Sequence, residues 1–317
     1  MYNTFFKLKR SPFNPTPDPV CFVPTNRHNE ALAALYHGVR QHKGFVVLTG
    51  EVGTGKTLLL RCLLGLLKES KDVASAYLFN GRLSPTEFLQ YILSDFGLPA
   101  KDKSKYELLL DLGHFLTSRG AANMTTVLIV DEAHHLSADI LEEVRLLSNL
   151  ETTDDKLLQI VLVGQPELDD KLDSVELRQL KQRIAVRTHL GELDADETRR
   201  YIAHRLQIAG LSPHSGPLFS EDAILAVHSY SRGLPRLINT LCENALIAAY
   251  ARHLLCVNAE IVESVAKEFR LDVASLRETA SVDSLSHSEV MRTLESLRQL
   301  LGGIEGSQRI PYTQARQ

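Results

Sequence analysis

The sequence contains few cysteines, and the four that it has, Cys21, Cys62, Cys242 and Cys256, lie far apart. No two of them have the spacing of about two to four residues with which zinc knuckles are built. The sequence therefore excludes a cysteine zinc knuckle and favours free thiols in a reducing compartment.

Long apolar runs are also absent. The longest strongly apolar stretch, residues 58–67, is interrupted by Arg61 and is shorter than the roughly 20 residues that span a bilayer. Residues 1–4 do not begin a signal peptide, because no charged segment, apolar segment and cleavage site follow one another there. We therefore expect a cytoplasmic protein with no membrane span.

An excess of positive charge is the third feature that the sequence lacks. Its 35 lysines and arginines and 39 aspartates and glutamates give a net charge of −4 at pH 7. Since proteins that coat nucleic acid are usually basic, this balance argues against such a role and leaves room only for a local basic patch.

Five short apolar runs occur between residues 44 and 189, and helical patterns separate them. These runs are residues 45–48, 76–79, 127–130, 160–163 and 184–188. Near-continuous apolar runs are typical of strands in a parallel sheet that is covered on both faces. Start signals such as the capping box Ser84–Glu87 mark the helices between them. The alternation predicts an α/β fold with a doubly wound, parallel, five-stranded sheet.

Changes in composition divide the 317 residues into four parts. Residues 1–30 are rich in proline and form an N-terminal arm that cannot be helical throughout. Residues 31–190 form the α/β domain, and residues 191–272 form a small, all-helical second domain. Its four helical patterns lie at residues 194–209, 220–231, 234–252 and 258–270. Residues 273–317 form a polar C-terminal tail, in which one narrow apolar stripe predicts an interaction helix, at Val290, Leu294, Leu297 and Leu301.

A phosphate-binding motif follows the first predicted strand. Residues 50–57, Gly-Glu-Val-Gly-Thr-Gly-Lys-Thr, match the pattern G-x-x-x-x-G-K-[ST] and stand at the start of a predicted helix. The glycines let backbone N–H groups face phosphate oxygens, and the helix N-terminus adds partial positive charge. We expect Lys56 to contact the β- and γ-phosphates and the Thr57 hydroxyl to bind Mg²⁺. The residues predicted to bind the nucleotide here are Gly50, Glu51, Val52, Gly53, Thr54, Gly55, Lys56, Thr57 and Leu58.

Two acidic residues, Asp131 and Glu132, end the third predicted strand. They should lie at the carboxyl edge of the sheet, where open α/β sheets bind their ligands. We expect Asp131 to hold Mg²⁺, directly or through water, and Glu132 to polarise the attacking water as a general base. Together with the phosphate loop, the pair predicts nucleotide hydrolysis rather than nucleotide holding.

Residues 131–134 also spell Asp-Glu-Ala-His, a tetrapeptide of helicases. We reject a helicase, because the chain after residue 190 is helical and too short to supply a second domain of the RecA type. His134 and His135 are adjacent. Since adjacent residues of a helix point to different faces, we do not expect them to share a metal ion.

Six segments carry a resemblance that extends well beyond the phosphate loop: Pro12–Pro19, Arg27–Leu32, Leu48–Thr57, Arg145–Thr152, Leu162–Leu168 and Gly233–Asn239. In this order they resemble the AAA+ ATPases, and above all the family of the general secretion pathway ATPase ExeA/GspA. The resemblance covers about residues 1–270, which is the ATPase module only. It implies an AAA+ P-loop fold with a helical lid domain, and ATP and Mg²⁺ as cofactors.

The resemblance also implies roles for residues outside the phosphate loop. Gln165 ends the strand that in this fold lies between the phosphate-loop strand and the Asp-Glu strand, and it would be the polar sensor near the γ-phosphate. Arg236, at the start of a lid helix, would be the second sensor, because a guanidinium is permanently charged and binds phosphate oxygens bidentately. Arg183 is the candidate arginine finger toward the neighbouring subunit's ATP, with Arg178 in reserve.

Each of these arginines has an alternative role, either as a solvated surface charge or as a member of a local ion pair. Arg27 and His28 would lie near the adenine, and for His28 a helix cap or a surface position is an equal alternative. An arginine finger implies active sites between subunits, and therefore a homo-oligomer in the form of a ring or a filament.

Three functions follow from this reading. The first is an oligomeric ATPase that assembles or remodels a protein partner in a secretion, pilus or exopolysaccharide system. The second is a DNA-bound, ATP-dependent transposition regulator (TniB/TnsC-like), which a group of basic residues favours: Arg178, Lys181, Arg183, Arg187, Arg199, Arg200 and Arg205. The third is an adaptor that binds ATP without hydrolysing it, against which Glu132 argues.

Overall fold

The computed structural model describes residues 2–16, 18–79, 83–152, 155–212 and 214–271. The chain divides into two compact units, Met1–Val265 and Ala266–Gln317. The sheet and its helices, the N-terminal arm and most of the helical region all belong to the first unit. The apolar stripe predicted at residues 290–301 lies outside the described residues.

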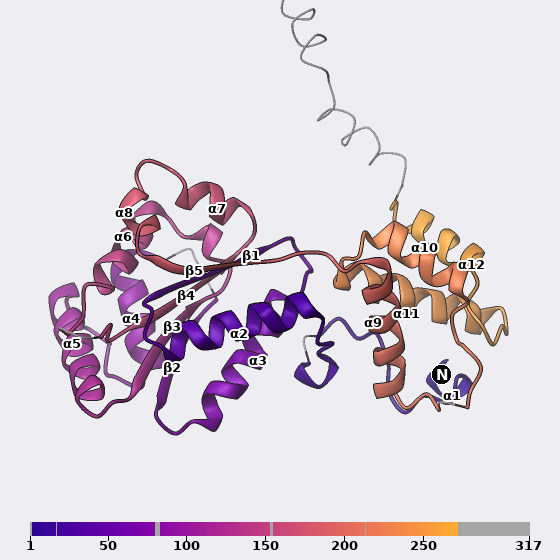
Figure 1. The fold of residues 1–317 in the computed structure, drawn as a ribbon, viewed down its shortest axis with the longest axis horizontal. Coiled ribbons are helices and arrows are strands. Elements are labelled where there is room, and N and C mark those ends of the chain that lie inside the picture. Colours follow the sequence, from indigo (N-terminus) through magenta and orange to yellow (C-terminus); the bar gives the residue numbers. More distant parts are fainter. Residues whose placement is uncertain (1, 17, 80–82, 153–154, 213, 272–317) are drawn as a thin grey trace, which may run out of the picture. The chain divides into compact units, whose positions relative to one another are not determined.

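The centre of the first unit is a parallel sheet of five strands with the order β2-β3-β4-β1-β5 (Figure 1). The strands are β1 Phe45–Gly50, β2 Val73–Leu78, β3 Thr125–Val130, β4 Gln159–Gly164 and β5 Ile184–Leu190. The predicted doubly wound α/β fold is therefore confirmed. The predicted second strand, residues 76–79, began three residues late and ended one residue late, because β2 starts at Val73 and stops at Leu78, beyond which Phe79 is exposed. Leu78 pairs with Val130, the last residue of β3, so the sheet ends there on both strands.

Helices cover both faces of the sheet, and alternate residues of each strand point to opposite layers (Figure 1). Val46 and Leu48 of β1 pack with α2 and α3, whereas Phe45 and Val47 pack with the helices of the other face. The two helices of the first face are α2 Asn26–Arg40 and α3 Lys56–Glu69. Those of the second face are α4 Pro85–Asp95, α5 Lys105–Ala121, α6 Ala138–Leu147, α7 Glu167–Leu172 and α8 Arg178–Lys181.

The local start signals of the helices are present in the structure. The Ser84 hydroxyl accepts the backbone N–H of Glu87, and the Glu87 carboxylate accepts that of Ser84, which completes the predicted capping box of α4. Such a cap contributes about 1 kcal/mol, because it satisfies donors that the first turn of a helix leaves free. Helix α4 therefore begins where the sequence predicts.

The helical region contains α9 Ala195–Ile208, α10 Glu221–Ser231, α11 Pro235–Ala251 and α12 Ala259–Glu268. Each lies within one of the four predicted patterns, and α11 has Pro235 in its first turn, where the missing N–H costs nothing. Phe219 and Val257 form an isolated bridge beside these helices. Within the described part of the chain, no helix has the length and apolarity that a membrane crossing requires.

The N-terminal arm is held against the helical region. It contains the short helix α1 Tyr2–Phe5 and the 3₁₀ turn η1 Pro19–Cys21, so it is not helical throughout. The Tyr2 hydroxyl donates a 2.5 Å hydrogen bond to the Glu243 carboxylate of α11. Phe13 is 1% exposed and meets the ring of Phe219 edge-on. Aromatic packing and hydrogen bonds therefore attach the arm to the helices.

Replacing Phe13 by Ala tests this attachment. Because Phe13 is fully buried, we expect Phe13→Ala to lower the free energy of unfolding by about 3 kcal/mol, as measured by urea denaturation. Val20→Ala is the control, since Val20 lies in the same arm and is 65% exposed. Equal unfolding midpoints for the two variants would show that the arm does not contribute to the folded core.

Candidate nucleotide-binding site

The phosphate loop connects β1 to the N-terminus of α3, as the sequence predicts. Gly53 and Gly55 have φ angles of 89° and 107°, which only glycine adopts without strain. The Thr54 side chain is buried, and its hydroxyl donates to the Glu51 carbonyl at 2.9 Å. The loop is therefore folded into a compact turn in front of the α3 N-terminus, where a phosphate would meet backbone N–H groups.

Lys56 lies inside this loop. Its side chain is 6% exposed, and its ammonium donates to the carbonyls of Gly50 at 2.6 Å and Glu51 at 2.9 Å. Burial lowers the pKa of Lys56, while the nearby carboxylates of Glu132 and Asp131 act in the opposite direction. The positive charge is thus held at the turn that would surround a phosphate group.

Asp131 is fixed by three hydrogen bonds at the carboxyl edge of the sheet. The carboxylate is 5% exposed; its Oδ2 accepts from the Thr57 hydroxyl at 3.2 Å and from the Tyr77 hydroxyl at 2.7 Å. Its Oδ1 accepts from the backbone N–H of Glu132 at 2.9 Å. The two residues predicted to hold Mg²⁺, Thr57 and Asp131, therefore touch each other.

The sequence reasoning did not find Tyr77. This residue lies in β2, adjacent to the Asp-Glu strand, and its phenol donates to a carboxylate that two other groups also hold. Burial raises the pKa of Tyr77, and the hydrogen bond to Asp131 raises it further, so the phenol remains a donor. A tyrosine in an apolar strand is an ordinary core residue, so no local signal identified it.

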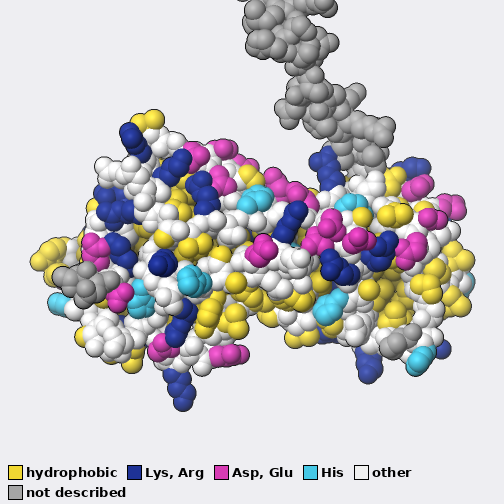
Figure 2. Space-filling model, viewed as in Figure 1, with side chains coloured by type: hydrophobic (Ala, Val, Ile, Leu, Met, Phe, Trp, Pro, Cys, Tyr) yellow, Lys and Arg dark blue, Asp and Glu magenta, His cyan; other side chains and the backbone are white. Residues whose placement is uncertain are grey.

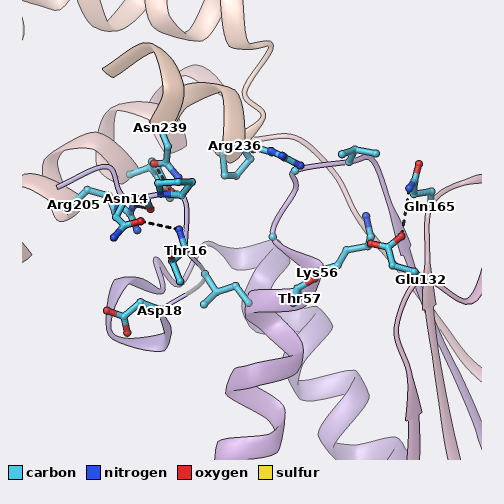
Figure 3. A pocket seen from close by; sticks show the side chains of 17 residues that line it. Asn14, Thr16, Asp18, Lys56, Thr57, Glu132, Gln165, Arg205, Arg236 and Asn239 are labelled. Carbon is cyan, nitrogen blue, oxygen red and sulfur yellow. Dashed lines mark hydrogen bonds between the residues drawn. The ribbon is translucent and has the colours of Figure 1, made fainter. Parts of the chain in front are cut away.

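Glu132 leaves the strand in a left-handed backbone conformation, with φ 54° and ψ 38°. A residue other than glycine pays about 1 kcal/mol or more for this conformation, and such strain concentrates at functional sites. The Gln165 side-chain amide lies 3.4 Å from the Glu132 carboxylate (Figure 3). Gln165 follows β4, which lies between β1 and β3 in the sheet. The predicted base and the predicted polar sensor are therefore neighbours.

The expectation that His134 and His135 point to different faces is wrong. Their ring centroids are 4.0 Å apart, because residues 133–135 form a 3₁₀ turn after the left-handed Glu132 rather than part of an α-helix. His134 Nδ1 lies 3.5 Å from a carboxylate oxygen of Glu132. Burial and the neighbouring His135 lower the pKa of His134.

A cavity of about 350 Å³ opens beside the phosphate loop (Figure 3). Three regions of the sequence line it: the arm at residues 14–16 and 18, the phosphate loop with Glu132 and Gln165, and the helical region at Tyr201, Arg205, Pro235, Arg236 and Asn239. Arg236, the predicted second sensor, is among the lining residues, and its backbone N–H donates to the Gly53 carbonyl at 3.2 Å. The start of α11 therefore contacts the phosphate loop.

Arg205 is the second residue that the sequence reasoning placed differently. The sequence places it among the basic residues that favour DNA, but in the structure it is 4% exposed and lines this cavity. One guanidinium nitrogen donates to the Asn14 carbonyl at 2.8 Å, and the guanidinium lies 5.7 Å from the centre of the Tyr201 ring. Its Nε has no hydrogen-bond partner among the described residues. Arg205 and Asn14 are 191 positions apart in the sequence, so the sequence pattern could not bring them together.

Arg27 and His28 do not line the main cavity as it is formed by the described residues. Arg27 is exposed and donates to the Glu192 carbonyl at 3.2 Å. His28 is buried behind the loop, where its ring bonds the Thr25 hydroxyl at 2.7 Å and borders a small second cavity with Thr54. Burial lowers the pKa of His28. Their role near the adenine stays a prediction.

Neither candidate arginine finger lines the cavity of its own chain, as far as the described residues show. Arg183 donates to the Ser148 hydroxyl at 2.5 Å, at the end of α6. Arg178 is exposed at the start of α8. The role of either arginine as a finger stays a prediction.

Three of the seven basic residues that favoured DNA, Lys181, Arg187 and Arg199, form ion pairs with acidic groups. Lys181 bonds Asp173 at 2.9 Å, and Arg187 lies 3.4 Å from Asp169. Arg199 bonds Asp196 and Glu221 at 2.6 and 3.0 Å, respectively. The face shown in Figure 2 likewise carries Asp and Glu among its Lys and Arg side chains. Paired charges present a weaker field to a phosphate backbone.

Comparisons with known proteins find relatives of this chain in sequence and in fold. The profile of the AAA domain family matches residues 39–172. General secretion pathway protein A of Aeromonas hydrophila is 46% identical over 254 residues, which cover 80% of this chain and 45% of that protein. This chain therefore spans less than half the length of that relative.

Solved structures are similar in fold. Cdc6p of Pyrobaculum aerophilum has a TM-score of 0.62 at 22% identity, covering 81% of this chain and 70% of its own. The ORC2 protein of Aeropyrum pernix has a TM-score of 0.60 at 18% identity, and the match covers 82% of this chain and 72% of the ORC2 chain. The RuvB Holliday junction branch migration motor of Thermotoga maritima has a TM-score of 0.55 at 16% identity, and the match covers 80% of this chain and 72% of the RuvB chain.

Tyr77→Phe tests the hydrogen bond that orients Asp131. We expect the Mg²⁺ concentration for half-maximal ATP turnover to rise about tenfold, because partners that orient a metal ligand affect metal affinity by roughly that amount. Nucleotide binding measured without Mg²⁺ should not change. Tyr106→Phe, at an exposed position of α5, is the matched control. The same Mg²⁺ dependence in both variants would show that the Tyr77 hydroxyl has no such role.

Proposed function

This chain belongs to the AAA+ ATPases of the general secretion pathway protein A family, and on that premise we propose that it hydrolyses Mg²⁺–ATP between its own copies to assemble or remodel a protein partner. The observation that carries the proposal is the convergence of Lys56, Thr57, Asp131, Glu132 and Gln165 at one edge of the sheet.

The donor set at this edge fits Mg²⁺. Thr57 and Asp131 offer a hydroxyl and a carboxylate oxygen 3.2 Å apart, and hard oxygen ligands of this kind are those that Mg²⁺ uses beside nucleotide phosphates. When bound, the ion would neutralise charge on the β- and γ-phosphates. The Tyr77 hydroxyl holds the Asp131 carboxylate in one orientation for this purpose.

Glu132 is the proposed general base. Its carboxylate accepts a hydrogen bond from the Gln165 side-chain amide. Because the carboxylate is also partly exposed, water can reach it, and it can take a proton from a water that attacks the γ-phosphate. Lys56 would stabilise the phosphate charge from within the loop, and Arg236 from the start of α11. The left-handed backbone of Glu132 supports a functional position, because backbone strain of this kind concentrates at functional sites.

The active site is proposed to be completed by a neighbouring subunit. Arg183, or Arg178 in its place, would bring its guanidinium to the γ-phosphate of the adjacent copy in a ring or a filament. The absence of both from the cavity-lining residues of the described chain supports an action in trans. The partner would belong to a secretion, pilus or exopolysaccharide system. The ion pairing of the basic cluster makes the DNA-bound alternative the weaker one.

Glu132→Gln tests the base. We expect turnover to fall by at least about a hundredfold, because a positioned general base contributes that much or more, while ATP binding by calorimetry stays unchanged. Glu263→Gln, an exposed glutamate of α12, is the control for loss of one carboxylate. Hydrolysis at the parent rate by the Glu132 variant would contradict the assignment.

Mixing two inactive variants tests the shared site. Arg183→Ala alone should lose about a thousandfold or more in turnover, as arginine fingers do in GTPases. If the finger acts in trans, an Arg183→Ala subunit retains its own Glu132 and can receive the arginine of an adjacent Glu132→Gln subunit. The mixture should therefore regain activity that neither variant has.

Mixing Arg178→Ala with Glu132→Gln in the same way shows which of the two arginines is the finger, because only the variant that lacks the finger should recover activity in the mixture. No recovery with either arginine variant, at concentrations where the parent protein is active, would contradict a shared site. Specific activity that does not depend on protein concentration would contradict it as well.

A further inference from the structure

Three potential metal ligands gather in the turn that follows β3. Glu132, His134 and His135 each present one ligand atom, and these atoms all lie within 4.8 Å of one another. The left-handed Glu132 and the 3₁₀ turn bring them together, as described above. Lys171 fixes the turn, because its ammonium donates to the carbonyls of His134 at 2.6 Å and Leu136 at 2.8 Å.

The chemistry of this set differs from that of the Mg²⁺ ligands. Two imidazoles and one carboxylate suit Zn²⁺ and other late first-row metals, whereas Mg²⁺ prefers oxygen ligands. The geometry points to a second, inhibitory metal site for Zn²⁺ or a similar ion, formed by Glu132, His134 and His135. It is separate from the Thr57–Asp131 pair, since none of its ligands belongs to that pair.

Small rearrangements suffice to close the site. His134 Nδ1 and Glu132 Oε2 are already 3.5 Å apart, close to the separation of two ligands around one Zn²⁺. Among the described residues, the one hydrogen bond that competes for that nitrogen is a long one, donated by the Gln165 backbone N–H at 3.4 Å. His135 is exposed, so its ring can rotate to join the other two.

Occupation of the site would stop hydrolysis without displacing ATP. A carboxylate that is bound to Zn²⁺ cannot accept the proton of the attacking water, and here that carboxylate is the proposed base. The inhibitory consequence therefore rests on the proposed function, but metal binding does not. The ATPase would be arrested with nucleotide bound whenever free Zn²⁺ rises.

Zn²⁺ titration in the absence of nucleotide and Mg²⁺ tests the binding step. With a Zn²⁺ indicator dye as competitor, we expect the full chain to bind one ion that His135→Ala binds at least about tenfold more weakly. His114→Ala, an exposed histidine of α5, is the control for nonspecific binding by the other histidines. His134→Ala should repeat the effect. Equal Zn²⁺ affinity in the parent protein and His135→Ala would overturn the site.

ATP hydrolysis at saturating Mg²⁺ tests the consequence. Zn²⁺ should inhibit the parent protein, a zinc-selective chelator should restore it, and His135→Ala should require at least about tenfold more Zn²⁺ for the same fractional inhibition. Equal sensitivity of the two proteins would overturn the inhibitory role. If histidine-dependent Zn²⁺ binding is found but no ATP is hydrolysed without Zn²⁺, the proposed function fails and the metal site stands. If ATP is hydrolysed but Zn²⁺ does not bind, the metal site fails and the proposed function stands.

Discussion

The structure of the site depends on one carboxylate, that of Asp131, and on the hydrogen bonds that hold it. Thr57 at the start of α3, Tyr77 in β2 and the backbone of Glu132 all donate to it. These bonds connect the phosphate loop to two neighbouring strands at the carboxyl edge of the sheet. A buried carboxylate is costly unless it is fully hydrogen-bonded, so the bonds both permit its burial and fix its direction. The proposed Mg²⁺ site, formed by Thr57 and Asp131, depends on this fixed carboxylate.

The fold was predictable because its signals are local. Apolar runs mark the strands, the box Ser84–Glu87 marks α4, and Pro235 marks the start of α11. A parallel sheet requires apolar strands on both faces, and the phosphate-loop pattern requires a strand before it and a helix after it. The order of strands placed Gln165 next to Glu132 once the family resemblance was recognised. These parts of the site follow from sequence spacing and topology.

The residues that were missed lie where tertiary structure decides. Tyr77 and Arg205 occur in ordinary strand and helix patterns, and only the packed structure brings them to the site. The grouping of His134 with His135 follows from the left-handed conformation of Glu132, which a non-glycine residue rarely adopts and which no sequence pattern indicates. Conversely, the pattern of basic residues did not indicate their ion pairs, because the structure decides that Lys181 meets Asp173 and that Arg187 meets Asp169.

The central claim is that the loop at residues 50–57 and the fixed Asp131 carboxylate form one Mg²⁺-dependent site for ATP. Calorimetric titration of the folded chain with ATP, at millimolar Mg²⁺ and again with the metal chelated, tests it most directly. We expect one ATP to bind per chain, and to bind markedly more weakly once Mg²⁺ is removed. No binding of adenine nucleotide by folded protein at millimolar Mg²⁺ would contradict it.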